Sequence, residues 1–276
     1  MKSIKLSGIY AAVLVMLICS PVAAFASGDK EHLTVPTPST VDALSEITSL
    51  ANYYAENLER YLDYRQRNLN LTTAEVVLRV NIGLDKPFYS DVEEIVNPVS
   101  LLVLCNKYNM LPANYIPEGY GRYDYHAMEL RKEAQDSFNL MQKSARKDGV
   151  NIYLVSGYRS YLAQKTIYEG YKAENPEAVD NFSSRAGSSE HQTGLAADIN
   201  TVYSKDRFER TSEFNWLQNN AHKYGFILRY PAEKEHITGY RFEPWHWRYV
   251  GEDVAMMIWE EGITLEEFFA GLPVGW

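Results

Sequence analysis

The sequence predicts an α+β fold, in which helices flank a small, mostly antiparallel sheet and a short helical segment precedes it. Amphipathic segments with helical spacing are interspersed with short apolar runs rich in β-branched and aromatic residues, which are typical of strands. The two kinds of segment do not follow the regular strand–helix–strand order of a parallel sheet. The chain of 276 residues is long enough for one sizeable core.

The beginning of the chain has the composition of a secretory signal peptide. Lys2 and Lys5 precede the apolar run IYAAVLVMLIC, and Ala24-Phe25-Ala26 resembles a cleavage site. We expect residues 1–26 to be removed and the protein to be secreted or associated with the cell wall. The alternative is an uncleaved segment that tethers the protein to the membrane, but the apolar run is short for a span and Pro21 interrupts it.

Charge and cysteine content exclude several classes of protein. The net charge of −9 at pH 7 becomes −11 when Lys2 and Lys5 are removed. An acidic chain repels nucleic acid and anionic lipid, so we expect neither as a partner. Cys105 is the only cysteine after residue 26, which rules out an internal disulfide. Its apolar surroundings indicate a buried hydrophobic residue rather than a nucleophile.

The rest of the chain divides into a linker and two structured parts. Residues 27–44 are polar and rich in Pro, Ser and Thr, which predicts a flexible linker. Residues 45–92 form a helical prelude, with one helix predicted over 45–68 and another that begins at Thr72 or at the residue after it. Residues 93–276 form the main domain.

The main domain mixes predicted helices and strands. A long amphipathic helix is predicted over 124–147, because apolar residues recur there at helical spacing. The other predicted elements are strands within 150–157, 194–199, 226–230 and 244–251, and helices over 160–174, 212–224 and 252–261, the first of them with Ser160 as its N-cap.

Three side chains of the main domain form a candidate metal site. His191 and Asp198 flank the segment QTGLAA, and His246 lies in EPWHWRYVG. Two imidazoles and one carboxylate are a familiar ligand set for a catalytic Zn²⁺ with one position left open. The neutral nitrogen ligands keep the ion electrophilic, while the carboxylate anchors it without saturating its charge.

A hydrolytic metal site also needs a base and an electrophilic partner. Glu243 lies three residues before the third metal ligand, and Pro244 argues against a helix there, so we expect Glu243 on an extended or turning segment where it can accept a proton from water. Arg159 lies where a predicted strand meets a predicted helix, and it can stabilise an oxyanion or hold a substrate carboxylate. Gln164 and Ser189 are expected to add hydrogen bonds to the substrate.

Each of these residues taken alone has a simpler structural interpretation. Asp198 could cap a turn, and Arg159 could form a structural ion pair. Trp245 and Trp247 are expected to pack rather than to contact substrate. A single histidine is more often structural than metal-binding, and on that basis four others are taken as surface or structural residues: His32, His126, His222 and His236.

The conjunction of motifs resembles a known family. The segments SGYRSYLAQ, SEHQTGLAAD and EPWHWRYVG carry, in order, motifs similar to those of the VanY-type D-alanyl-D-alanine carboxypeptidases. These enzymes belong to the LAS group of zinc metallopeptidases, whose relatives include VanX dipeptidases, L,D-carboxypeptidases and the hedgehog signalling domain. The resemblance covers residues 95–260. It implies that 93–276 is a zinc carboxypeptidase domain with a LAS/hedgehog-like peptidase fold.

The resemblance also implies a role for each candidate residue. It implies a single Zn²⁺ per chain and peptidoglycan stem peptides as substrates, from which the terminal D-Ala is removed by metal-activated water. The implied metal ligands are His191, Asp198 and His246; the implied base is Glu243; Arg159 would polarise the scissile carbonyl, and Ser189 and Gln164 would contact the substrate.

The sequence leaves other functions open. The same motifs serve L,D-carboxypeptidases, which act on tetrapeptide stems, and an endopeptidase that cuts cross-links would need only a more open cleft. From another class, a non-catalytic module could bind wall peptides without cutting them. Such a module has no need of a base beside the metal, so Glu243 and Arg159 favour an enzyme.

Overall fold

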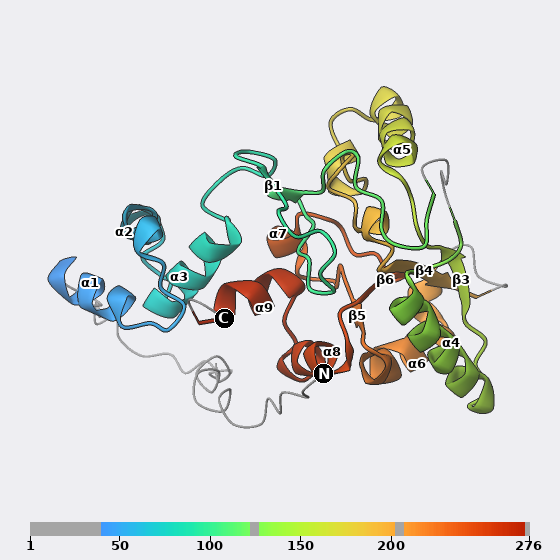
Figure 1. Ribbon diagram of the computed structural model, residues 1–276. Helices are drawn as coiled ribbons and strands as arrows, with labels where there is room; N and C mark the ends of the chain where they lie inside the picture. The colour runs from blue at the N-terminus through green and yellow to red at the C-terminus, as the bar shows by residue number, and fades with distance from the viewer. Residues whose placement is uncertain (1–39, 122–126, 202–206, 274–276) are drawn as a thin grey trace, which may run out of the picture. The chain divides into compact units, whose positions relative to one another are not determined.

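The computed structural model describes residues 40–121, 127–201 and 207–273 (Figure 1). They belong to one compact unit, which begins at Ser39. Residues 1–26, predicted to be a signal peptide, lie outside the described residues. In the part of the chain that is described, no helix is both long enough and apolar enough to cross a lipid bilayer.

A four-stranded antiparallel sheet lies at the centre of the main domain. In spatial order its strands are β3 (Tyr153–Ser156), β4 (Ala196–Asn200), β6 (His246–Tyr249) and β5 (Phe226–Leu228). All neighbouring strands are antiparallel, which confirms the predicted α+β class. A separate parallel pair of two-residue strands joins β1 (Glu93–Glu94) to β2 (Asn109–Met110).

Helices surround this sheet. The α-helices of the described residues are α1 (Thr40–Thr48), α2 (Leu58–Arg67), α3 (Thr73–Ile82), α4 (Lys132–Lys147), α5 (Tyr161–Glu174), α6 (Ser212–Asn220), α7 (Glu235–Thr238), α8 (Glu252–Glu261) and α9 (Leu265–Gly271). Short 3₁₀ turns are η2 (Ala55–Asn57), η3 (Val179–Asn181), η4 (Glu190–Thr193), η5 (Phe208–Arg210) and η6 (Ala221–Tyr224). The four strands and three later helices predicted for the main domain are therefore present, while α7 and α9 were not predicted.

The two faces of the sheet have different chemistry because side chains alternate along a strand. On β6, Trp247 and Tyr249 point to one face, and His246 and Arg248 point to the other. The first face packs against α4 and α6 (Figure 1), whose side chains share its buried apolar cluster: Phe138, Met141, Phe214 and Leu217. The opposite face carries Asp198, His246 and Arg248, and with them the candidate site.

The prelude differs from its prediction in two places. The linker was expected to run to residue 44, but α1 already begins at Thr40, because Ala43 and Ile47 are buried in the prelude core. The single helix expected over 45–68 is two helices, α1 and α2. Hydroxyl groups end the first one, since Thr48 Oγ1 donates to the Leu44 carbonyl at 3.0 Å and Ser49 Oγ to the Glu46 carbonyl at 2.8 Å.

The C-terminal helix α9 contacts the prelude. The Asn52 side chain donates to the Ala270 carbonyl at 2.9 Å, and Asn81 donates to the same carbonyl at 3.3 Å. Ile82, Ile237 and Ala270 form a small apolar cluster beside these bonds. The prelude is therefore attached to the main domain through α9.

The long helix predicted over 124–147 begins later, at Lys132. Residues 124–126 lie outside the described residues, and the next ones run extended beside the end of β3. There the Ala127 N–H donates to the Tyr158 carbonyl at 2.9 Å, and the Tyr158 N–H to the Glu129 carbonyl at 2.9 Å. Gly157 permits this approach, because a Cβ at that position would collide with the Glu129 carbonyl.

Candidate metal centre

The sheet register brings two of the predicted metal ligands together. Asp198 lies at the middle of β4, where it pairs with Ser156 on β3 and His246 on β6. The predicted strand ended at residue 199, and Asp198 taken alone could have capped a turn, but the pairing continues to Asn200. Directly paired residues of antiparallel strands project from the same face, so the carboxylate and the imidazole lie side by side.

The third predicted ligand, His191, comes from the 3₁₀ turn η4. Its Nδ1 lies 2.6 Å from the Gly157 carbonyl oxygen, which can only accept a hydrogen bond. Nδ1 therefore carries the proton, and Nε2 is left with a free lone pair. Gly194, with φ of +70°, ends the turn and leads the chain directly into β4.

The three side chains fit a tetrahedral cation. The Asp198 Oδ1 atom lies 3.4 Å from His191 Nε2 and 3.3 Å from His246 Nδ1. Ligands about 2.0–2.1 Å from a tetrahedral zinc ion are separated by about 3.3 Å. Among the described residues Oδ1 is buried without a hydrogen-bond partner, although both nitrogens face it. A divalent cation would satisfy all three atoms, whose mutual distances are at most 4.8 Å.

Glu243 lies beside these ligands on a turn. The His246 N–H donates to the Glu243 carbonyl at 3.1 Å, with Pro244 at the second position of the turn, where proline is favoured. This confirms that the segment is not helical. The Glu243 carboxylate lies 3.8 Å from His246 Nδ1, on the side of the ring that faces Asp198. Its burial raises the pKa of Glu243 to about 7, against the opposing effect of His246.

Arg159 borders the site from the start of α5. Its Nη2 lies 3.8 Å from Asp198 Oδ2 and donates to Ser156 Oγ at 3.2 Å, while its Nη1 donates to Gln164 Oε1 at 2.8 Å. The Nε atom is buried without a hydrogen-bond partner within the described residues. Ser160 caps α5 by accepting the N–H of Ala163, as predicted, and so fixes the point at which the guanidinium leaves the backbone.

The two predicted substrate contacts are both buried. The Gln164 side chain is held at both ends, because its Nε2 also donates to the Ser184 carbonyl at 2.6 Å. The amide therefore orients Arg159. Ser189 is the residue before η4, two positions from His191, and the structure places it next to the ligand turn. Neither position by itself establishes a contact with substrate.

Glu190 is a residue that the sequence analysis missed. Its Oε2 lies 3.5 Å from His246 Nε2, on the side of the ring opposite to the metal ligands. Its Oε1 accepts hydrogen bonds from Arg229 and Arg248, each at 2.8 Å. Burial alone would raise the pKa of Glu190, but the two guanidinium groups hold it well below its ordinary value. The signal in the sequence was an arginine within each of two apolar strand segments, FILRY and WHWRYV.

The other histidines and tryptophans have structural positions. His222 is buried and stacks on Trp259 with ring centroids 3.9 Å apart, and His236 is exposed. His32 and His126 lie outside the described residues. Trp247 is part of the apolar core and Trp245 packs against it, in agreement with the predicted packing role.

Cys105 also has the predicted character. Its side chain is completely buried in the apolar core, and its Sγ lies 3.4 Å from the Gly187 carbonyl. Burial raises the pKa of the Cys105 thiol, which keeps it protonated and unreactive.

Known proteins are similar to this chain in sequence and in fold. The family model for VanY, D-alanyl-D-alanine carboxypeptidase, matches residues 127–252, which include every predicted site residue. A putative carboxypeptidase, YodJ of Bacillus subtilis, is 39% identical over 206 residues, or 68% of this chain and 76% of the relative.

Two solved structures extend the comparison. The LdcB LD-carboxypeptidase superposes with a TM-score of 0.61 at 40% identity, over 66% of this chain and 92% of LdcB. A mutant of the vancomycin-resistance D,D-pentapeptidase VanY in complex with Zn(II) superposes with a TM-score of 0.53 at 34% identity, over 61% of this chain and 98% of VanY. With the site geometry, these similarities show that the chain is a carboxypeptidase of the VanY family of D-alanyl-D-alanine carboxypeptidases.

Proposed function

We propose that the protein is a zinc-dependent D,D-carboxypeptidase with one Zn²⁺ per chain, which removes the terminal D-Ala from peptidoglycan stem peptides. One observation carries this proposal. The buried Asp198 Oδ1 lies between His191 Nε2 and His246 Nδ1 at 3.4 and 3.3 Å, and the carboxylate of Glu243 is on the same side of the His246 ring. The zinc complex of the VanY structure supports the choice of metal.

The residues of the site can perform the hydrolysis of an amide bond. A zinc ion at the three ligands would supply a Lewis acid, which lowers the pKa of water toward about 7 and polarises the scissile carbonyl. Glu243 accepts a proton from the attacking water as the new C–O bond forms. It then donates that proton to the amine of the departing D-Ala as the C–N bond breaks.

The other predicted residues serve the substrate. Arg159 faces the centre from beside Asp198, so its charge can stabilise the negative charge that develops on the carbonyl oxygen. Ser189 and Gln164 remain proposed contacts of the substrate peptide. Gln164 has a second task in the proposal, because its hydrogen bond from Arg159 fixes the plane of the guanidinium.

An L,D-carboxypeptidase is the second candidate. It would remove D-Ala from a tetrapeptide, where the preceding centre has the L configuration. The observation that favours it is the similarity to LdcB, which is greater in identity and in TM-score than the similarity to VanY. The metal ligands and the base are the same for both reactions, so the choice depends on residues that contact the stem peptide.

Product analysis distinguishes these functions. Purified protein is incubated with a pentapeptide stem and with a tetrapeptide stem, with and without a chelator and after zinc is restored, and products are weighed by mass spectrometry. Loss of one Ala from the pentapeptide alone, abolished by chelator, is the expected result. Loss from the tetrapeptide would move the assignment to L,D-carboxypeptidase. The Glu243→Gln protein, purified in parallel, controls for contaminating peptidases.

A result in which neither peptide is shortened would decide against the proposal. If the protein binds zinc but leaves both stems intact, the carboxypeptidase proposal fails. Cross-linked dimers are then the next substrate, and binding of uncut stems would identify a non-catalytic wall-peptide module.

We also propose that the protein acts outside the cytoplasmic membrane. Residues 1–26 have the pattern of a signal peptide, and the structural study of LdcB concerns peptidoglycan recognition. The intact mass of the protein recovered from culture supernatant and from the wall fraction tests this proposal. A mature chain that begins at Ser27 is expected, whereas recovery in the membrane fraction with residues 1–26 attached would identify a tether.

A further inference from the structure

The His246 ring is held between two carboxylates. Its Nδ1 faces Asp198 Oδ1 at 3.3 Å, and its Nε2 faces Glu190 Oε2 at 3.5 Å. Both His246 Nε2 and Glu190 Oε2 are buried, and within the described residues neither has a hydrogen-bond partner that meets the usual geometry. At 3.5 Å from one another, each atom can satisfy the other after a small shift.

Glu190 is fixed from behind by two arginines. Its Oε1 accepts from Arg229 Nε and from Arg248 Nη1, and the side chains of all three residues are 0% exposed. Arg248 is two positions after His246 on β6, so both side chains project from one face of the strand. Since Oε1 already accepts two charged donors, Oε2 is the oxygen that remains for the imidazole.

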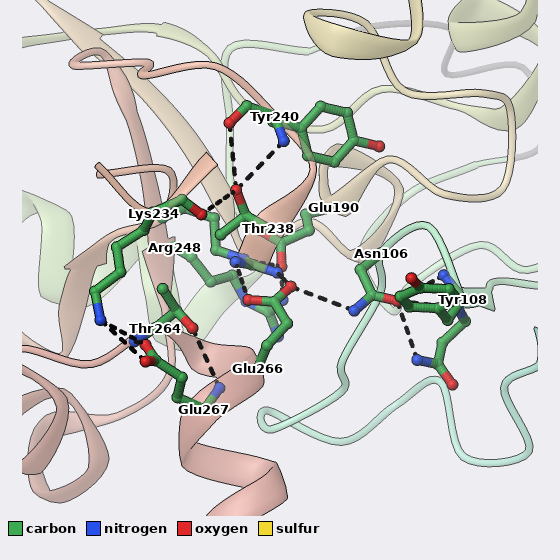
Figure 2. Close-up of polar contacts among 12 residues, drawn as sticks. Asn106, Tyr108, Glu190, Lys234, Thr238, Tyr240, Arg248, Thr264, Glu266 and Glu267 are labelled. Atoms are coloured by element: carbon green, nitrogen blue, oxygen red, sulfur yellow. Dashed lines mark hydrogen bonds and ion pairs between the residues drawn. The ribbon is translucent and has the colours of Figure 1, made fainter. Parts of the chain in front are cut away.

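The support continues to the C-terminal helix. Glu266 on α9 accepts two hydrogen bonds from Arg229, at 2.8 and 2.6 Å. It accepts a third from Asn106 at 3.3 Å (Figure 2). We call Glu190, Arg229, Arg248 and Glu266 the buried ion network. Its two positive and two negative charges balance, so Glu190 remains ionised without a charge on His246.

We infer that Glu190 is a positioning residue for the metal centre and that Glu266 on α9 supports it through Arg229. The inference rests on the proposed metal site. Glu190 accepts the Nε2–H of His246, which leaves Nδ1 as the unprotonated nitrogen that faces the cation. The order of contacts runs from α9 through Arg229 and Glu190 to the ring.

Zinc affinity tests the inference without any peptide substrate. The full chain carrying Glu190→Gln is compared with wild type by competition against a chromogenic chelator. We expect zinc binding to weaken by about 10- to 100-fold, the usual effect of losing the carboxylate behind a ligating histidine. Glu267→Gln is the matched control. Glu267 neighbours Glu266 on α9 but pairs with Lys234 instead of Arg229, so its affinity should not change. Wild-type affinity in a folded Glu190→Gln protein would overturn the inference.

A measurement on wild type avoids dependence on the stability of the variant. In the zinc-loaded, ¹⁵N-histidine-labelled chain, His246 should show a proton on Nε2 and none on Nδ1. Zinc bound through Nε2, or a proton on Nδ1, overturns the inference, and so does a chain that binds no zinc. If zinc binds with the expected tautomer and no stem peptide is cut, the inference stands and the proposed function fails.

Discussion

Glu190 and Glu243 lie on opposite sides of one imidazole, 3.5 and 3.8 Å from its two nitrogens. Both are buried, yet their protonation chemistry differs. The pKa of Glu190 is held well below its ordinary value, whereas burial raises the pKa of Glu243 to about 7. The difference lies in their partners, because Glu190 accepts hydrogen bonds from two arginines and Glu243 is close to another carboxylate, Asp198.

This difference separates two tasks that the same residue type performs. A permanently ionised carboxylate is a fixed acceptor, and it suits the orientation of a ligand. A carboxylate with a pKa near neutrality can accept a proton and return it, and it suits catalysis. In the proposed mechanism, the side of His246 that faces the metal site carries the reaction, and the side that faces the buried ion network holds the geometry.

The largest effect is expected on the catalytic side. Glu243→Gln keeps the size of the side chain but removes the base, so kcat should fall by about 10²- to 10⁴-fold. Zinc content, measured by atomic emission, should stay that of wild type because Glu243 is not a proposed ligand. A Glu243→Gln protein with near-wild-type kcat would contradict the division of tasks.

A substitution in the buried ion network should lower the free energy of unfolding rather than the rate of the chemical step. Glu266→Ala leaves Arg229 with one carboxylate instead of two, and removing a partner from a buried ion pair typically costs about 3–5 kcal/mol of the free energy of unfolding. Glu267→Ala breaks the more exposed pair with Lys234 and a helix cap, which should cost about 1 kcal/mol. Urea denaturation of both variants measures the two losses in the free energy of unfolding. Equal losses would show that the buried ion network contributes no more to stability than the more exposed pair does.

The acid limb of the pH dependence of the reaction should report Glu243. Glu243 acts as a base only when ionised, so kcat/KM should fall about tenfold per unit as the pH drops below its pKa. A bound cation favours the carboxylate, which places this limb between the ordinary value of about 4.3 and 7. Glu190 stays ionised across that range. A limb centred above pH 7 would contradict the assignment.

Local signals explain which parts of the fold could be predicted. The strands and caps, such as Ser160 before α5, depend on residues that are close in sequence, and they agree with the structure. The late start of α4 depends on hydrogen bonds between 127–129 and 157–158, far apart in the chain. No pattern within residues 124–131 could reveal that pairing.

The candidate site shows the same limit. His191, Asp198, His246 and Glu243 carry recognisable spacings, and the structure brings them together. Glu190 is adjacent to His191, but its task depends on Arg229 and Arg248, which are 39 and 58 positions away. Motifs identify residues by type and spacing, whereas a supporting residue is defined by the contacts behind it.

The smallest effect is expected at Gln164, which resembles Glu266 in that each acts through an arginine, Arg159 or Arg229. Gln164 holds Arg159 with one end of its amide and the Ser184 carbonyl with the other. If orientation of Arg159 is its main task, Gln164→Ala should lower kcat by about tenfold and leave KM unchanged, since the guanidinium acts on the transition state. Arg159→Ala should cost more. A Gln164→Ala protein with a raised KM and wild-type kcat would instead identify the direct substrate contact that the sequence predicts.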